Sequence, residues 1–116
     1  MLRALRAGEA VGLLPDQVPG GGQGRWVPFF GRAAYSMVLP ERLAAQTGAA
    51  VVLAVGERLA GGRGWRLHLE RLDGPPTPER LNACFERLVR LLPEQYLWAY
   101  NRYKRPAGVE PAPGHA

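Results

Sequence analysis

Short apolar runs, separated by glycine and proline, indicate where strands form in this chain. Residues 10–14 and 49–55 are apolar runs of strand length without alternation, which is typical of strands buried on both faces. Residues 65–70 alternate strictly between apolar and polar side chains. This alternation predicts a half-buried strand that pairs with residues 54–59 across the turn at Gly61–Gly62. Three strands are therefore expected, of which the first two are buried and the last two pair in a hairpin.

Apolar residues at helical spacing predict two helices in the middle of the chain. Ser36 is expected to cap a helix that runs to Thr47 and stops at Gly48, with Pro40 near its first turn. A second helix is expected to start at Thr77 as the N-cap, followed by a proline and an acid. Its apolar stripe, which faces the core, comprises Leu81, Cys84, Phe85, Leu88 and Leu92.

Shorter elements are expected towards both ends and after the first strand. Residues 1–7 read as the last turns of a helix closed by Gly8, and residues 26–30 as extended backbone. Pro93 ends the second long helix, and residues 94–102 are expected to start another short one. The tail after Pro106 lacks apolar periodicity, which predicts disorder. The order strand, helix, strand, strand, helix, helix indicates an α/β fold.

Composition narrows the possible partners without choosing among them. The chain has 116 residues, the size of one small domain or part of a larger one, and a net charge of +5. A basic surface suits nucleic acid, anionic lipid head groups or phosphorylated substrates. The single cysteine, Cys84, rules out an internal disulfide and is expected in the core. No run approaches the roughly 20 apolar residues of a membrane-spanning helix.

Asp16 and Gln17 are the first candidate functional residues, because they follow an apolar run and precede a glycine-rich loop. Functional groups are often presented on loops held by a rigid scaffold. An Asx-type turn at a strand end would explain the same residues without any ligand. Residues 20–24 lack the following lysine of a nucleotide-binding loop, so a loop that closes over a bulky substrate fits better.

Several blocks of this chain together resemble the late acyltransferases of lipid A biosynthesis, in the lysophospholipid acyltransferase superfamily. The resemblance runs from about residue 2 to residue 106 and covers only the C-terminal part of such an enzyme. It implies the C-terminal part of a glycerolipid-acyltransferase-like mixed sheet flanked by helices, with residues 1–106 as the acyltransferase part and residues 107–116 as a disordered tail. The blocks that carry it are Gly12–Gln17, Val27–Arg32, Leu39–Ala44, Thr47–Ala49, Gly56–Arg58 and Pro93–Trp98.

The resemblance implies a reaction and its partners. The family moves a fatty acyl chain from acyl carrier protein, or sometimes acyl-CoA, to a hydroxyl of an acylated, phosphorylated glucosamine disaccharide. The expected partners are therefore acyl carrier protein, a lipid A precursor and the anionic surface of the bacterial inner membrane. The expected location is the cytoplasmic face of that membrane, where this part of the enzyme would be peripheral. No metal or other cofactor and no nucleic acid are expected.

The resemblance also implies substrate-binding residues. Asp16 and Gln17 would contact a polar atom of the acceptor or hold the loop that does. Phe29 and Phe30 would line an acyl groove, although core packing is the alternative. Arginine suits bidentate phosphate recognition, and among Arg25, Arg32 and Arg58 the last two are favoured over solvated surface roles because each ends an element. The full set of candidates is Asp16, Gln17, Phe29, Phe30, Gly31, Arg32 and Arg58.

No catalytic residue is assigned. His68 and Asp73 match the His-x-x-x-x-Asp spacing of the superfamily, in which the histidine is the general base, but they follow the Pro15–Asp16 pair instead of preceding it. We therefore interpret His68 as a strand residue and expect the isolated chain to be inactive. The alternative is a non-catalytic basic module that binds anionic lipid or single-stranded nucleic acid. The aromatic and basic residues 93–105 suit packing against the domain, a membrane interface or stacked bases.

Overall fold

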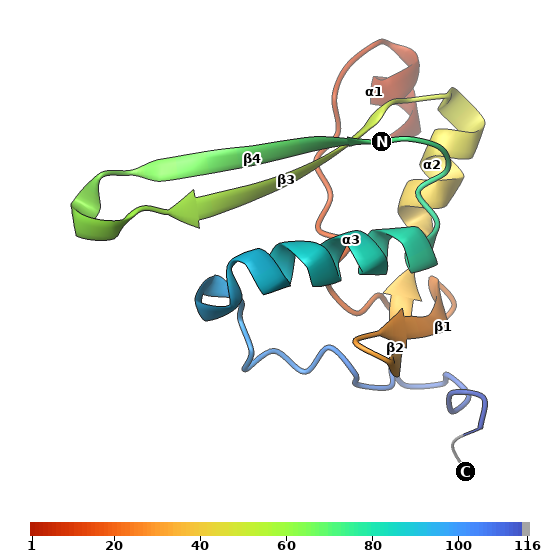
Figure 1. The fold of residues 1–116 in the computed structure, drawn as a ribbon. Helices are drawn as coiled ribbons and strands as arrows, with labels where there is room; N and C mark the ends of the chain where they lie inside the picture. The colour runs from red at the N-terminus through yellow and green to blue at the C-terminus, as the bar shows by residue number, and fades with distance from the viewer. Residues whose placement is uncertain (115–116) are drawn as a thin grey trace.

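The computed structural model describes residues 1–114 and has helices and strands in one chain, as Figure 1 shows. The α/β class is confirmed, and the strands form two separate antiparallel pairs, β1–β2 and β3–β4. Within the described residues no helix has the length and apolarity that a membrane span requires. The elements are α1 (Leu2–Arg6), β1 (Gly24–Phe29), β2 (Arg32–Met37), α2 (Leu39–Thr47), β3 (Val51–Arg58), the 3-10 turn η1 (Ala60–Gly62), β4 (Trp65–Leu72), α3 (Pro78–Leu91) and the 3-10 turn η2 (Pro93–Gln95).

The β1–β2 hairpin forms the centre of the core. Its register pairs Phe29 with Arg32, so Phe30 and Gly31 alone make the turn. Both turn residues have positive φ, +50° and +74°, as the tight two-residue hairpin turn requires. The extended backbone expected for residues 26–30 is thus confirmed as far as Phe29. Helix α3 packs against β1, and Val27, Phe29, Ala34 and Leu81 are among the buried apolar side chains.

The expected β3–β4 hairpin is confirmed, with Arg58 opposite Trp65 and Val51 opposite Leu72. Its burial is different from the prediction. Val52 is 55% exposed, so β3 is covered on only one face. The alternation in β4 is present, but its apolar residues Leu67 and Leu69 are 64% and 63% exposed. In Figure 1 the hairpin runs alongside α3, and its tip projects beyond the end of that helix.

Three expectations are wrong, because the presence or the absence of a tertiary partner decided the local structure. Residues 10–14 form no strand and belong to no ladder, since a strand needs a neighbour that accepts and donates its backbone hydrogen bonds. Ser36 pairs with Arg25 inside β2 and is not a helix cap, so α2 begins at Leu39 instead. Residues 94–102 hold only η2 and turns, because so short a helix is marginal without supporting packing.

The predicted helix ends are confirmed where short-range chemistry fixes them. Thr77 Oγ1 accepts a hydrogen bond from the Arg80 N–H at 3.2 Å, and Pro78 is the first residue of α3. Gly48 ends α2 with a φ of +67°, the left-handed cap geometry. Cys84, expected in the core, is only half-buried. Asn82, a polar residue of the same helix, is fully buried.

Part of the C-terminal tail lies against the hairpin β1–β2. Trp26 Nε1 donates a hydrogen bond to the Glu110 carbonyl at 3.0 Å, and Ala112 is buried. The disorder expected for residues 107–116 stays a prediction, because a contact does not measure order. Residues 115–116 lie outside the described residues.

Candidate functional site

The loop that carries Asp16 and Gln17 is a turn tied to the C-terminal segment. The Gln17 N–H donates to the Leu14 carbonyl at 3.4 Å, and both candidate side chains are exposed. The next backbone amide, Val18 N–H, donates to the Tyr100 hydroxyl at 2.8 Å. Tyr100, 82 positions along the chain, therefore holds the backbone at Val18, directly after the turn. Asp16 is exposed, and among the described residues its carboxylate has no hydrogen-bond or ion-pair partner, so it is open to a ligand.

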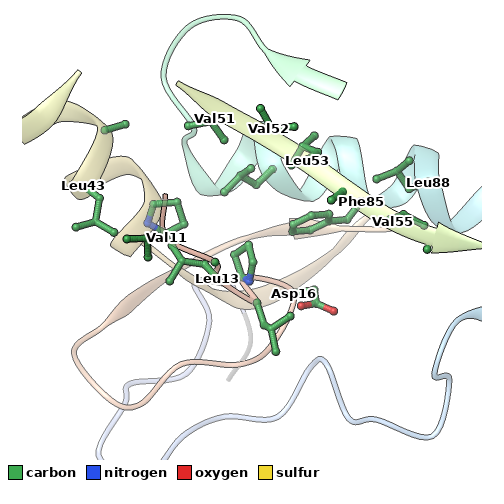
Figure 2. A pocket seen from close by; sticks show the side chains of 18 of the residues that line it. Val11, Leu13, Asp16, Leu43, Val51, Val52, Leu53, Val55, Phe85 and Leu88 are labelled. Atoms are coloured by element: carbon green, nitrogen blue, oxygen red, sulfur yellow. The ribbon is translucent and has the colours of Figure 1, made fainter. Parts of the chain in front are cut away.

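Asp16 lies at the rim of an apolar hollow of about 480 Å³ between residues 11–16, β3 and α3. Figure 2 shows Val11 and Leu13 on one side of the hollow, with Leu53 of β3 and Phe85 of α3 on the other. Asp16 is the one candidate residue of the seven that lines it. A single carboxylate beside apolar walls suits an amphipathic molecule or an apolar polypeptide segment.

Four candidate residues gather at the β1–β2 turn, away from the hollow. Phe29 is 4% exposed, and its ring centroid lies 4.7 Å from that of Phe30 and 6.2 Å from that of Tyr103. The Arg32 guanidinium lies over the Tyr103 ring, 4.5 Å from its centroid. Gly31 completes the turn. Burial makes Phe29 part of the core packing, and contact of this group with a ligand stays a prediction.

Phe30 occupies a strained backbone position that α3 stabilises. It is the one non-glycine residue with positive φ in the described chain, at +50°. Its N–H donates to Glu86 Oε1 at 2.6 Å, and the Arg90 guanidinium lies 5.0 Å from its ring centroid. Non-glycine residues in this region cost about 1–3 kcal/mol and persist where their surroundings hold them. Two side chains of α3 thus hold the turn in a fixed shape.

Arg58 is the last residue of β3 and belongs neither to the lining of the hollow nor to the β1–β2 turn. Its backbone N–H donates to Gln95 Oε1 at 2.8 Å, and its carbonyl accepts from Gln95 Nε2 at 3.0 Å. Its guanidinium lies 5.5 Å from the centroid of a Trp65 ring. The side chain is exposed, so its remaining N–H groups face solvent. The seven candidates therefore occupy three places instead of surrounding one cavity.

A buried polar cluster joins the core to the C-terminal segment, and sequence reasoning missed it. Arg102 is 3% exposed, and its Nη1 donates to the Tyr35 carbonyl at 2.9 Å and its Nη2 to Ser36 Oγ at 2.8 Å. Asn82 Nδ2 donates to the same Ser36 Oγ at 2.9 Å. Burial lowers the pKa of the Arg102 guanidinium, while the nearby Tyr96 and Tyr100 hydroxyls and Asp16 act in the opposite direction. The only signal in the sequence was the basic and aromatic character of residues 93–105.

His68 lies in β4 beside an acid other than Asp73. Its Nε2 is 3.6 Å from Glu57 Oε1, too long for a hydrogen bond, and that nitrogen is buried without a partner. No hydrogen bond joins His68 to Asp73, whose carbonyl accepts from Arg80 instead. Across residues 1–114 there is also no group of three His, Cys, Asp or Glu side chains that could hold a metal ion. The His68 imidazole is therefore not hydrogen-bonded to an orienting carboxylate.

Comparison with known proteins places these features in a family. The family model described as bacterial lipid A biosynthesis acyltransferase matches residues 1–105. The chain is 33% identical over 118 residues to a lipid A biosynthesis lauroyltransferase of Escherichia coli. This match covers 94% of the chain and 39% of the relative. It is 35% identical over 115 residues to a lipid A biosynthesis palmitoleoyltransferase of Escherichia coli and to a lipid A biosynthesis acyltransferase of Shigella flexneri. These matches cover 90% of the chain and 37% of each relative.

The chain thus spans less than two-fifths of the length of these curated relatives. The match nevertheless includes the Asp16 loop, both hairpins and the three helices, because all of them fall within residues 1–105. The resemblance seen in the sequence is confirmed at the level of the family. The chain belongs to the bacterial lipid A biosynthesis acyltransferase family.

Proposed function

We propose that this chain supplies the acceptor side of a lipid A acyltransferase. The observation that carries the proposal is the family match over residues 1–105, together with an exposed Asp16 at the rim of an apolar hollow. Asp16 and Gln17 offer hydrogen-bond acceptors and a donor to the sugar of the acceptor lipid. The Tyr100 hydroxyl holds the loop behind them, which limits the entropy that substrate binding must remove.

The reaction that we propose is transfer of a fatty acyl chain from acyl carrier protein to a hydroxyl of a lipid A precursor. The hydroxyl oxygen bonds to the thioester carbonyl carbon, the carbon–sulfur bond breaks, and a general base takes the hydroxyl proton. We assign that base to a His-x-x-x-x-Asp/Glu segment outside this chain, because His68 Nε2 makes no hydrogen bond to a carboxylate and lies 3.6 Å from Glu57 Oε1. General-base catalysis contributes roughly 10²- to 10⁴-fold, so the isolated chain should be inactive.

Arg32 and Arg58 are our candidates for binding the phosphate groups of the lipid precursor and of the membrane lipids. Each guanidinium lies on an aromatic ring and keeps its N–H edge available at an exposed position. Such a planar fork suits bidentate contact with phosphate. We place the working enzyme at the cytoplasmic face of the inner membrane, where acyl carrier protein can reach it and where this chain would lie peripherally.

A chimera tests the proposal. Residues 1–105 replace the aligned stretch of the Escherichia coli lauroyltransferase, and acyl transfer from acyl carrier protein to a lipid A precursor is measured. We expect Asp16→Ala to lower kcat/KM by about tenfold or more, since it removes a charged hydrogen-bond partner of the acceptor. The exposed Glu9→Ala is the matched control and should leave kcat/KM unchanged. Equal activity of the Asp16→Ala chimera and its parent would refute the role of the loop.

The isolated 116-residue chain provides the second arm of this experiment. It should show no acyl transfer, and His68→Ala in the chimera should leave activity unchanged. Measurable transfer by the isolated chain that His68→Ala abolishes would overturn both assignments.

A non-catalytic role at an anionic lipid surface is the second candidate, and the exposure of Leu97 and Trp98 favours it. These side chains are 69% and 61% exposed and lie a few residues before Lys104 and Arg105. An apolar and basic surface of this kind suits a membrane interface. Co-sedimentation with phosphatidylglycerol vesicles, lost in Leu97→Glu, would support it. Binding of single-stranded nucleic acid in place of the vesicles would identify the other partner class.

A further inference from the structure

The glycine-rich loop, residues 18–24, connects the Asp16 turn to β1, and one tyrosine of β2 holds its end. The N–H groups of Gly22 and Gly24 donate to the Tyr35 hydroxyl at 3.1 and 3.2 Å. A hydroxyl oxygen has two acceptor lone pairs, so a single tyrosine can accept both hydrogen bonds. Tyr35 is 4% exposed, and close packing around its ring leaves the hydroxyl little freedom to move. The end of the loop is therefore attached to the β1–β2 hairpin.

A second tyrosine holds the start of the same loop. The Val18 N–H donates to the Tyr100 hydroxyl at 2.8 Å, directly after the turn that carries Asp16. Tyr100 is joined to the first tyrosine through the C-terminal segment, because Arg102 donates from Nη1 to the Tyr35 carbonyl at 2.9 Å. The two ends of the loop therefore depend on one connected set of contacts.

The attachment at Val18 also restricts the turn before it. Asp16 lies only two residues upstream, and each residue has two freely rotating backbone bonds. The Gln17 N–H closes the turn by donating to the Leu14 carbonyl at 3.4 Å. Few backbone rotations are left by which Asp16 could move relative to the Tyr100 hydroxyl.

The composition of the loop makes this attachment consequential. Four of residues 18–24 are glycines, and glycine has the most conformational freedom to lose when a chain becomes ordered. A free loop of this kind would have to be ordered when a ligand binds, which lowers affinity. The glycines alone favoured a loop that closes over its substrate, but such a movement would have to break the hydrogen bonds at both ends. The contacts favour a fixed wall instead.

We propose that Tyr100 and Tyr35 are positioning residues for acyl transfer, whose hydroxyls hold residues 16–24 as a fixed wall of the acceptor site. Neither hydroxyl touches the substrate. Both act through the backbone of the loop and thus through Asp16, which meets the acceptor lipid. This inference rests on the proposed function for its catalytic part, whereas the attachment of the loop can be measured without any substrate.

The first experiment measures amide hydrogen exchange in the 116-residue chain. Tyr100→Phe removes one hydroxyl and should speed exchange of the Val18 amide about tenfold, while the Gly22 and Gly24 amides stay as protected as in the parent. Tyr35→Phe should give the converse pattern. Tyr100 is only half-buried and its ring is retained, so this variant is expected to fold even if the buried Tyr35→Phe variant does not.

The second experiment measures both Michaelis constants in the chimera with the Escherichia coli lauroyltransferase. Tyr100→Phe should raise the KM for the lipid acceptor about tenfold and leave the KM for the acyl carrier protein thioester unchanged, because only acceptor binding needs the ordered loop. A variant that merely lost folded enzyme would lower kcat and change neither KM. In the Asp16→Ala chimera, Tyr100→Phe should have no further effect, since the two residues act as a unit.

Thr47→Val is the matched control. Its hydroxyl also accepts a backbone amide, that of Ala49 at 3.2 Å, but at the end of α2 and outside the loop. This variant should keep both KM values and the exchange rates of the loop amides. The control thus separates the loss of any hydroxyl acceptor from the loss of one that holds the loop.

The proposal is overturned if exchange at Val18 is the same in Tyr100→Phe and the parent. It is also overturned if Tyr100→Phe leaves the acceptor KM unchanged or raises both KM values alike, and the proposed function then stands or falls on Asp16→Ala alone. A selective rise in the acceptor KM with Tyr100→Phe, together with full activity of Asp16→Ala, would refute the acceptor role of Asp16. That result would keep the tyrosines as positioning residues for another group of the loop.

Discussion

Arg102 donates a hydrogen bond to Ser36 across 66 positions of sequence, with Nη2 2.8 Å from Oγ. Both residues are buried, and Asn82 donates to the same hydroxyl oxygen. Arg102 forms no ion pair with Asp or Glu within residues 1–114. Its hydrogen bonds and the Phe29 ring, whose centroid lies 5.5 Å from the Arg102 guanidinium carbon, therefore compensate for the burial of its charge. The cluster holds the C-terminal segment, β2 and α3 together.

Removing this guanidinium should destabilise the fold. Arg102→Met leaves the Tyr35 carbonyl and Asn82 Oδ1 without a donor, and each unsatisfied buried group costs about 1–3 kcal/mol. Urea unfolding should therefore show a lower free energy of unfolding by at least the cost of one such group. The control is the exposed Arg105→Met, which should unfold at the same urea concentration as the parent. Equal stability of both variants would show that the cluster contributes nothing net.

The carboxylate of Glu86 should stabilise the strained turn at Phe30. Glu86→Ala removes the acceptor 2.6 Å from the Phe30 N–H, and a hydrogen bond to a charged group contributes about 1.5–3 kcal/mol. The melting temperature and free energy of unfolding should fall. Glu94→Ala, an exposed acid outside this contact, serves as the control. If Phe30→Gly, which needs no stabilisation at positive φ, makes the Glu86→Ala change harmless, the two residues act as a unit.

Gly24 should tolerate no side chain, for steric reasons. A Cβ there would lie 2.6 Å from the Ser36 carbonyl oxygen, 2.7 Å from Tyr35 Cε2 and 2.8 Å from Pro19 Cγ. Gly24→Ala should cost about 1–3 kcal/mol through overpacking. Gly12→Ala, where no heavy atom lies within 4 Å of the added Cβ, is the matched control and should be close to neutral. Thermal unfolding of the two variants makes the comparison.

The ion pairs of Arg25 should add a small acid-sensitive contribution to stability. The hydrogen bond from Arg25, 2.7 Å from Glu79 Oε2, lowers the pKa of the Glu79 carboxyl. Because the folded-state pKa is lowered, this stabilisation is present above the carboxyl's ordinary pKa and is lost as the pH falls through the lowered value. The pair is about half exposed, so Glu79→Gln should cost only about 0.2–1 kcal/mol at neutral pH. The difference from the parent should disappear in acid, and a constant difference down to about pH 2 would contradict the linkage.

Local chemistry made some elements predictable from sequence, and long-range contacts decided the others. Thr77 and Pro78 start α3 as expected, because an N-cap hydroxyl needs only the amide three residues later. Ser36 has the same hydroxyl but lies in the β1–β2 ladder, a pairing that the helix-like sequence after it concealed. Residues 10–14 have the composition of a strand, yet no described segment pairs with them.

The candidate site likewise has parts that short sequence motifs predict and parts that depend on long-range contacts. The family blocks pointed to the Asp16 loop and the β1–β2 turn as candidates, because short contiguous motifs can be recognised in the sequence without knowing the fold. Arg102 could not be found in this way, since fourteen arginines looked alike and burial distinguishes only this one. Its partners Ser36 and Asn82 come from other elements, so no spacing rule joins them.

The extended β3–β4 hairpin also has a consequence for proteolysis. Its tip, η1 and the residues up to Gly64, is exposed and contains Arg63, a trypsin site whose Nε and backbone N–H both donate to the Ala60 carbonyl within the same turn. Exposed loop tips are preferred sites of nicking. A protease that cuts there first would leave two pieces still joined by the eight paired positions of the ladder, from Val51–Leu72 to Arg58–Trp65. The nicked protein would thus migrate as one species under native conditions and as two after denaturation.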